Sequence, residues 1–379
     1  MDKYVVRIVR TRKEMNDFVR LPYKIYAGNS CYVPDLELDV RGTFNPSHNP
    51  GLEFSSIAAF VAYDESHQPV GRIAGIVNRK ANATWKVKTV RFAFIEMIDD
   101  IEVTRLLLDA VAQWGRQQGM TEIQGPMGIS DFDKEGMLVD DFDIEGSAIA
   151  IYNPAYYPRH LEALGYAKAV DWVSVRVKVP PTLPARFAKA ASMVTRLYGL
   201  RVRKLTGREI IKGGYGHKIF HLLNEAYKPL YGFSEFSEEQ IDYFVKKFMP
   251  LVDYKRMMPV VTDKKGDLVG AAITMCSLSH ALKKAGGRLL PFGWFHLLRA
   301  LKGRHSDMAD LLLVAVRPDY QGLGVNALFF ADLVKVYNQM GIKVAQTGPQ
   351  LETNVKELSQ WKLFDPQYVC RRRCYCKKI

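Results

Sequence analysis

The chain has 379 residues and a formal net charge of +13, with 48% hydrophobic and 25% charged residues. This length allows two domains that each bury a core, and the composition is ordinary for a soluble globular protein. No apolar run approaches the roughly 18 residues of a membrane span, and the N-terminal segment MDKYVVRIVRTRKEM is too charged for a signal-peptide core. We therefore expect a cytoplasmic protein.

The first half of the chain alternates strand and helix signals. Short apolar runs separated by a polar turn predict a hairpin over residues 60–63 and 70–77, and a long helix then ends at Gly119. A further strand is expected over residues 172–179. The proline cluster Pro180–Pro184 that follows it indicates the boundary between two domains, residues 1–180 and 181–379.

The second half repeats this order. Residues 259–262 and 268–275 predict a second hairpin, and a second long helix ends at Gly341. Aligning Gly119 with Gly341 places Gln124 opposite Gln346, and one inserted residue then brings Gly125-Pro126 opposite Gly348-Pro349. The pattern predicts an α/β fold with a mixed sheet, built from two similar units in tandem.

The segment LLLVAVRPDYQGLGVNALF, residues 311–329, joins a buried strand to an amphipathic helix through a glycine-bearing turn. Glycines there let the backbone approach a ligand closely, and the first N–H groups of the helix point outward at the positive end of the helix dipole. The turn from Gln321 to Asn326 therefore predicts a phosphate-binding site. The alternative is an ordinary strand–turn–helix corner.

The corresponding turn of the first half carries Asp99, Asp100 and Glu102 in place of glycines. Carboxylates cap a helix well but repel a pyrophosphate. We expect that only the second half binds a phosphate-bearing ligand, and that the first half shapes a second-substrate site.

Charge is distributed unevenly along the chain. Residues 172–208 hold nine Lys and Arg, and residues 268–306 hold six, in both cases without a carboxylate. Residues 131–145 hold seven Asp and Glu and one Lys. The basic stretches indicate an anionic partner or simply a solvated face. Because no base-stacking motif accompanies them, specific nucleic-acid binding is not expected.

An insertion at about residues 277–306 distinguishes the second half from the first. It mixes Leu, Phe and Trp with the cations Lys283, Lys284, Arg288, Arg299, Lys302 and Arg304. This composition fits a segment in peripheral contact with an anionic membrane, or a lid over an acyl chain. It equally fits an amphipathic helix packed on the core.

Five cysteines in a chain of this size favour a reducing compartment over a disulfide scaffold. The spacing of Cys370, Cys374 and Cys376 matches no common zinc pattern, and the intervening Arg371–Arg373 would repel a cation. We expect reduced thiols on a final strand and no metal site.

The turn after residue 316 resembles motif A of the GNAT (GCN5-related N-acetyltransferase) enzymes, Gln/Arg-x-x-Gly-x-Gly/Ala, in which Gln321 and Gly324 match and Asn326 departs. The chain as a whole resembles the tandem GNAT family related to bacterial ceramide synthase. The matching segments are YVPDL, VGRIAGIVN, FAFIEMIDD, GPMGISDFDKEGMLVDDFD, YNPAYYPRHLEALGYAKAVDW and GRLLPFGWFHLL.

This resemblance implies direct transfer of an acyl group from a coenzyme A (CoA) thioester to an amine, without a covalent enzyme intermediate. It implies that two central strands separate into a V and that a backbone N–H stabilises the tetrahedral oxyanion. The residues expected to hold the thioester, acetyl-CoA or a longer acyl-CoA, are Leu313, Val314, Ala315, Val316, Gln321, Gly322, Leu323, Gly324, Val325, Asn326 and Asn354.

A base must take a proton from the attacking ammonium, directly or through water. Glu352 is the first candidate and Asp310 the second, and both could instead be surface carboxylates. Seven residues after Asn354, where many GNAT enzymes have a tyrosine that protonates the leaving thiolate, this chain has Trp361. An indole cannot act as an acid at neutral pH, so the thiolate leaves unassisted, Tyr320 helps, or catalysis has been lost.

Three functions follow from these observations. The first is an acyl-CoA N-acyltransferase with a long-chain or sphingoid-type amine acceptor at the inner face of a membrane. The second is an acetyltransferase for a small polar amine that the acidic stretch attracts. The third is a non-catalytic CoA-binding or membrane-binding protein with this fold.

Overall fold

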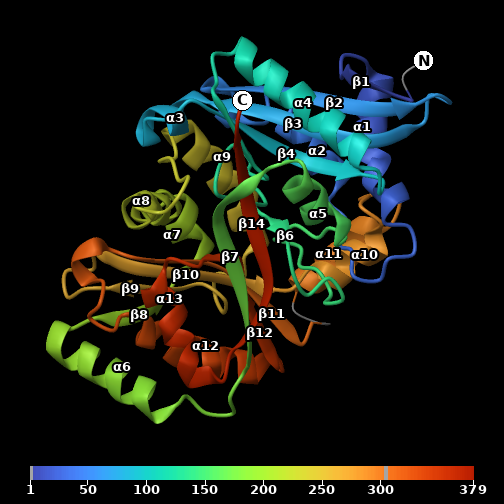
Figure 1. Cartoon of the computed structure of the whole chain (residues 1–379). Coiled ribbons are helices and arrows are strands. Elements are labelled where there is room, and N and C mark those ends of the chain that lie inside the picture. The colour runs from blue at the N-terminus through green and yellow to red at the C-terminus, as the bar shows by residue number, and fades with distance from the viewer. Residues whose placement is uncertain (1–2, 303–305) are drawn as a thin grey trace. The chain divides into compact units, whose positions relative to one another are not determined.

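The computed structural model describes residues 3–302 and 306–379. The chain forms two compact units. The first contains Met1–Val173, Ser279–Trp294 and Val369–Ile379, and the second contains Ser174–Leu278 and Phe295–Tyr368. The units differ from a linear division at residue 180 because two later segments, including the end of the chain, return to the first unit (Figure 1).

The first unit is built on a sheet in the order β1-β2-β3-β4-β5-β14-β7, in which β4 and β5 are parallel and β1 to β4 are antiparallel neighbours. The small strand β6 pairs with β14. The helices and strands of the first unit are β1 (Tyr4–Ile8), α1 (Arg12–Ile25), α2 (Glu37–Thr43), β2 (Ser55–Asp64), β3 (Pro69–Asn78), α3 (Arg79–Trp85), β4 (Thr89–Met97), α4 (Ile101–Gln117), β5 (Glu122–Gly125), β6 (Met137–Leu138), α5 (Tyr156–Ala163), β7 (Ala167–Lys178), α10 (Ser279–Ala285) and β14 (Gln367–Lys378).

The second unit begins within β7 and has the strand order β7-β12-β11-β10-β9-β8, with β13 also paired to β7. Figure 1 shows α6, α12 and α13 on one side of these strands and α7, α8 and α9 on the other. Its elements are α6 (Ala185–Tyr198), β8 (Arg201–Lys204), α7 (Gly207–Ile211), α8 (Tyr215–Tyr227), α9 (Glu238–Phe248), β9 (Pro259–Thr262), β10 (Leu268–Cys276), α11 (Gly293–Leu301), β11 (Met308–Val316), α12 (Asn326–Met340), β12 (Val344–Thr347), β13 (Gln350–Leu351) and α13 (Val355–Gln360).

The two units repeat one motif: antiparallel strands, a long helix, and a strand parallel to the last of them. Gln124 of β5 lies opposite Arg91 of β4, and Gln346 of β12 lies opposite Asp310 of β11. This register confirms the predicted alignment of the two glutamines. The mixed α/β fold class predicted from the sequence is also confirmed.

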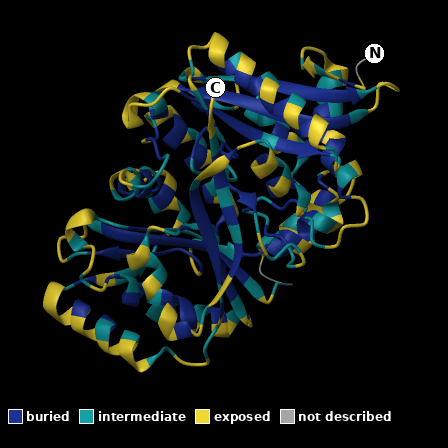
Figure 2. Ribbon diagram, in the orientation of Figure 1, coloured by how far each residue is buried: buried dark blue, intermediate teal, exposed yellow. Residues whose placement is uncertain are grey.

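Each long helix packs on its sheet through a glycine on the strand beneath it. A Cβ built on Gly71 of β3 would lie 2.7 Å from Leu107 of α4, and one on Gly270 of β10 would lie 3.0 Å from Phe329 of α12. Both helices bury an apolar stripe at helical spacing against the strands, and these stripes form the dark blue interior in Figure 2.

The last strand contains the three clustered cysteines, as predicted, and all five cysteines of the chain are free thiols. In the described part of the chain, no three His, Cys, Asp or Glu side chains are grouped to hold a metal ion. None of the described helices has the length and hydropathy required to cross a membrane.

The insertion forms α10, a loop and α11. α10 and the loop after it are fixed within the first unit, because Lys283 of α10 pairs with Glu145 at 2.5 Å and Arg288 of the loop pairs with Glu37 at 2.8 Å. The last part of the insertion, residues 303–305 with the cation Arg304, lies outside the described residues.

Candidate active site

β11 and β12 run side by side at first and then separate. Met308–Leu311 pairs with β12, and beyond it the Gly348 N–H donates a hydrogen bond to the Leu311 carbonyl at 3.1 Å. β11 continues to its end with β10 on its other side. Leu313–Val316 therefore has an edge that β12 does not cover, which is the V that the resemblance implies.

A β-bulge lies at the point of separation. Thr274 of β10 lies opposite Leu311 and Ile273 lies opposite Leu313, so Leu312 is an extra residue on β11. Bulges bend a strand and re-aim the residues that follow. This one turns β11 away from β12 just where their pairing ends.

Val314 and Val316 direct their backbone groups to the uncovered edge. The Arg317 N–H bonds to the Val269 carbonyl of β10 at 2.8 Å, and in an antiparallel pair the residues that bond to the partner alternate with those that do not. Arg317 and Ala315 thus face β10, whereas Val314 and Val316 face away from it. No described backbone group accepts a hydrogen bond from either valine N–H on this side.

The turn after β11 contains two glycines with positive φ. Gly322 and Gly324 adopt φ of 80° and 86°, the left-handed region that side chains disfavour. Gln321 donates from Nε2 to the Val316 carbonyl at 3.0 Å, which fixes the turn to the end of β11. Within the described residues, no group accepts from the N–H of Gly324, Val325 or Asn326, so these amides are available to an anion.

Asn326 departs from the motif without obstructing it. Its Nδ2 donates to Oε1 of Gln360 at 2.8 Å, so the side chain ties the first residue of α12 to the end of α13. Asn354 accepts from the Glu357 N–H at 3.3 Å and caps α13. Glu357 in turn accepts from Gln350 at 3.2 Å, and burial raises its pKa to about 7.

Asp310 is the most deeply buried of the candidate bases, at 1% exposed. It lies in a row with Gln346 and Arg176 across β11, β12 and β7, and Arg176 donates to Gln346 at 2.6 Å. Burial raises the pKa of Asp310 to about 7, opposed by a hydrogen bond with Ser277 and the charge of Arg176. Among the described residues, nothing donates a hydrogen bond to its Oδ1.

The row lies on the α8 side of the strands. Leu311, the next residue, lines a cavity with residues of α12. Successive side chains of a strand point to opposite faces, so Asp310 points away from α12.

The other two catalytic candidates lie elsewhere in the second unit. Glu352 is partly exposed and follows β13. Tyr320 lies in the turn before the glycines, with its ring 4.6 Å from the Arg317 guanidinium, which itself pairs with Asp319 at 2.7 Å. Tyr320 lies beyond Val316, just before Gln321 and the two glycines.

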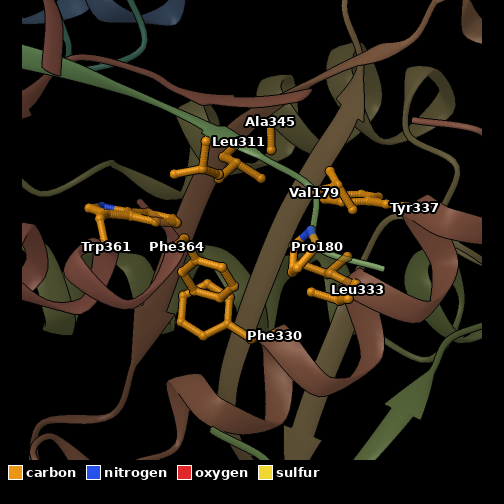
Figure 3. Close-up of a pocket in the computed structure, with 11 residues that line it drawn as sticks. Val179, Pro180, Leu311, Phe330, Leu333, Tyr337, Ala345, Trp361 and Phe364 are labelled. Atoms are coloured by element: carbon orange, nitrogen blue, oxygen red, sulfur yellow. The ribbon is translucent and has the colours of Figure 1, made fainter. Parts of the chain in front are cut away.

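Trp361 is a core residue, 4% exposed, with Nε1 bonded to Gln350 at 3.0 Å. Its ring packs against Phe330 of α12, and both line a cavity of about 40 Å³ whose lining is apolar or aromatic (Figure 3). This cavity is too small for a long acyl chain as it stands. The other lining residues include Leu311, Leu333, Tyr337, Ala345 and Phe364.

In the first unit the corresponding edge is occupied by side chains. Met97 lies opposite Gly71 as Val316 lies opposite Gly270, so these two residues are equivalent. Tyr157 Oη accepts from the Met97 N–H at 3.1 Å and Tyr156 Oη donates to the Met97 carbonyl at 2.6 Å. The helix that follows is capped by Asp100, which accepts from the Glu102 N–H at 2.9 Å, as its sequence predicts.

Sequence reasoning missed Tyr227, the last residue of α8, whose hydroxyl donates to the Val314 carbonyl at 3.1 Å. It also missed the row of Asp310 with Gln346 and Arg176. No motif surrounds Tyr227, and no local pattern in the sequence marks the row.

No family model matches the chain. It is 24% identical to Protein YghO of Escherichia coli (strain K12) over 384 residues, covering 99% of this chain and 95% of that one. It is also 24% identical over 317 residues to the bacterial ceramide synthase of Caulobacter vibrioides (strain NA1000 / CB15N), covering 83% and 80% of the two chains.

A tandem GNAT protein from the clavulanic acid biosynthesis pathway superposes with a TM-score of 0.56 at 11% identity, over 99% of this chain and 98% of that one. The chain therefore has the tandem GNAT fold, as its sequence predicted.

Proposed function

We propose that the second unit binds an acyl-CoA thioester and transfers its acyl group to an amine. The uncovered edge of β11 supports this proposal most strongly, because it presents the N–H groups of Val314 and Val316 beside a glycine turn with unbonded amides. The pantetheine arm would pair with Leu313–Val316, and the pyrophosphate would bind at Gln321–Asn326. The acyl-CoA supplies the activated carbonyl.

The uncovered edge also offers an oxyanion site. A backbone N–H of β11 would donate to the thioester oxygen as it gains charge during attack by the amine. Holding thioester and amine together at this edge would supply a further part of the rate. Asn354, on the α13 side, would contact the same cofactor.

Asp310 is the base that the geometry supports better than Glu352. It is buried beside the point where the strands separate, whereas Glu352 is partly exposed. A carboxylate whose pKa lies near the working pH is protonated and deprotonated readily, and burial gives Asp310 a pKa of about 7. It would take the proton of the attacking ammonium, directly or through water.

A lipid-like amine at a membrane surface is the acceptor we favour. The insertion exposes Leu290, Phe292 and Trp294, at 78%, 71% and 49%, in a segment without carboxylates. Apolar side chains beside cations are typical of segments that enter an anionic interface. The name of the Caulobacter relative, bacterial ceramide synthase, agrees with a long-chain amine. The protein would then act in the cytoplasm, at the inner membrane face.

A small polar amine attracted by residues 131–145 has less support. Several of these carboxylates already have cationic or backbone partners within the first unit. Glu145 pairs with Lys283 at 2.5 Å, and Asp141 accepts from the Cys370 N–H at 2.8 Å.

The proposal is tested by thiol release from acetyl-CoA, octanoyl-CoA and palmitoyl-CoA, each with sphinganine, with ethanolamine or without an amine. The expected result is amine-dependent release of one CoA thiol per amide formed, fastest with a long chain and sphinganine. CoA binding without amine-dependent release from any pair would instead support a non-catalytic binding protein.

A further inference from the structure

Tyr227 brings a phenol to the uncovered edge of β11. It is the last residue of α8, a helix that packs on β10 and β11, and its hydroxyl donates to the Val314 carbonyl at 3.1 Å. Its ring also makes an edge contact with Phe233, with centroids 5.9 Å apart. These two contacts therefore hold the side chain in this position.

The Val314 carbonyl fixes where that hydroxyl lies. Because Val314 faces away from β10, an atom bonded to its carbonyl lies in the opening left by β12. This is the edge to which the proposed function assigns the pantetheine arm. Asp310, four residues earlier on β11, is at most about 14 Å away along the strand, which leaves room for the thioester and the amine between the two side chains.

The reaction needs an acid at this edge. When the tetrahedral intermediate collapses, the carbon–sulfur bond breaks and the sulfur leaves as a thiolate that must gain a proton. Trp361 is buried against Phe330 and its indole cannot donate one. Tyr320 lies beyond Val316, beside the glycine turn, and its ring faces Arg317.

We propose that the Tyr227 phenol protonates the departing CoA thiolate. The proposal rests on the proposed function, since it requires the thioester at this edge. An amide N–H of the pantetheine arm replaces the Tyr227 hydroxyl as the donor to the Val314 carbonyl. The hydroxyl then turns to the thioester sulfur, which is two carbons from that amide nitrogen. Its proton passes to sulfur as the bond to carbon breaks, giving CoA thiol, amide and phenolate. The nitrogen loses its second proton as the amide forms, and this proton or one from solvent restores the phenol.

The kinetic test compares Tyr227→Phe with Tyr215→Phe. Tyr215 begins the same helix and its hydroxyl accepts from Arg203 at 3.1 Å, so the control removes the same atom at a site remote from β11. Loss of a general acid costs about 100-fold or more in kcat, while binding of the acyl-CoA is retained. We expect this loss in Tyr227→Phe alone, with the alkaline decline of kcat abolished. Equal kcat in both variants would overturn the role.

A second readout does not depend on turnover. Thiolate absorbance is followed while the thiol of bound CoA is titrated in the wild type and in Tyr227→Phe. A hydrogen bond to the thiolate lowers the thiol pKa, so the variant is expected to raise it by about one unit. CoA binding with identical titrations would overturn the role of Tyr227 but leave the proposed function standing. No CoA binding by the wild type would overturn both.

Discussion

Asp310 is buried, so its carboxylate lowers the stability of the folded chain when it is charged. Burial raises its pKa to about 7 in the folded chain, against a usual value near 3.8, so the folded state binds this proton more tightly than the unfolded state does. The contribution of Asp310 to stability therefore falls as the pH rises from about 4 to about 7, and the full penalty remains above that.

Asp310→Asn should remove the loss of folding stability caused by the buried charge, and it should also remove the base. Unfolding by urea at pH 5 and pH 8 is expected to show the variant gaining stability relative to the wild type at the higher pH, by a few kcal/mol at most. The kcat of the wild type should rise through pH 7, and the variant should lose this rise together with about 100-fold or more of its rate. A rising limb retained in Asp310→Asn and lost in Glu352→Gln would assign the base to Glu352.

The insertion at about residues 277–306 is the clearest difference between the sequence of the second unit and that of the first. Its first helix and the loop that follows are anchored by ion pairs of Lys283 and Arg288, so deleting the whole insertion would damage the first unit. Point substitutions in the exposed loop between α10 and α11 avoid this difficulty. Leu290 and Phe292 are the most exposed apolar side chains there.

Replacing both by Ser should weaken membrane binding without unfolding the protein. Flotation with phosphatidylcholine vesicles, with and without phosphatidylglycerol, is expected to show binding that needs the anionic lipid and falls several-fold in the variant. The control replaces Leu38 and Ile211, which are 66% and 67% exposed, by Ser. Equal flotation of both double variants, or none by the wild type, would contradict membrane contact by this loop.

At the scale of the whole molecule, local patterns predicted the repeated unit well. Apolar runs bounded by turns predicted the strands, and β9 has the predicted bounds Pro259–Thr262. Gly341 ends α12 at φ 75°, as its position in the sequence predicts. These features depend only on residues that are close together in the chain, so they can be predicted from a single sequence.

Other features depend on pairing between distant segments. The sequence predicted the last strand but not that it lies between β5 and β7, because nothing local specifies a strand's neighbour. The row of Asp310, Gln346 and Arg176 exists only when three strands take one register. Tyr227 reaches Val314 across 87 residues of chain.

We propose that only one of the two units binds CoA, through the turn after β11. The first unit places tyrosines on the equivalent edge, at Met97, and a carboxylate at its helix start. A titration calorimetry measurement with CoA is therefore expected to give one site per chain. Gly324 is the residue whose change tests that site most directly.

Gly324→Ala forces a side chain onto φ of 86° in the turn, and Gly341→Ala imposes a similar strain at the other end of α12, where φ is 75°. Hydrogen bonds to a charged phosphate contribute about 1.5–3 kcal/mol each, so disturbing one should weaken CoA binding about 10-fold or more. We predict one site per chain, weakened by Gly324→Ala and unchanged by Gly341→Ala. Two sites, no binding, or equal loss in the two variants would contradict binding of CoA by this turn alone.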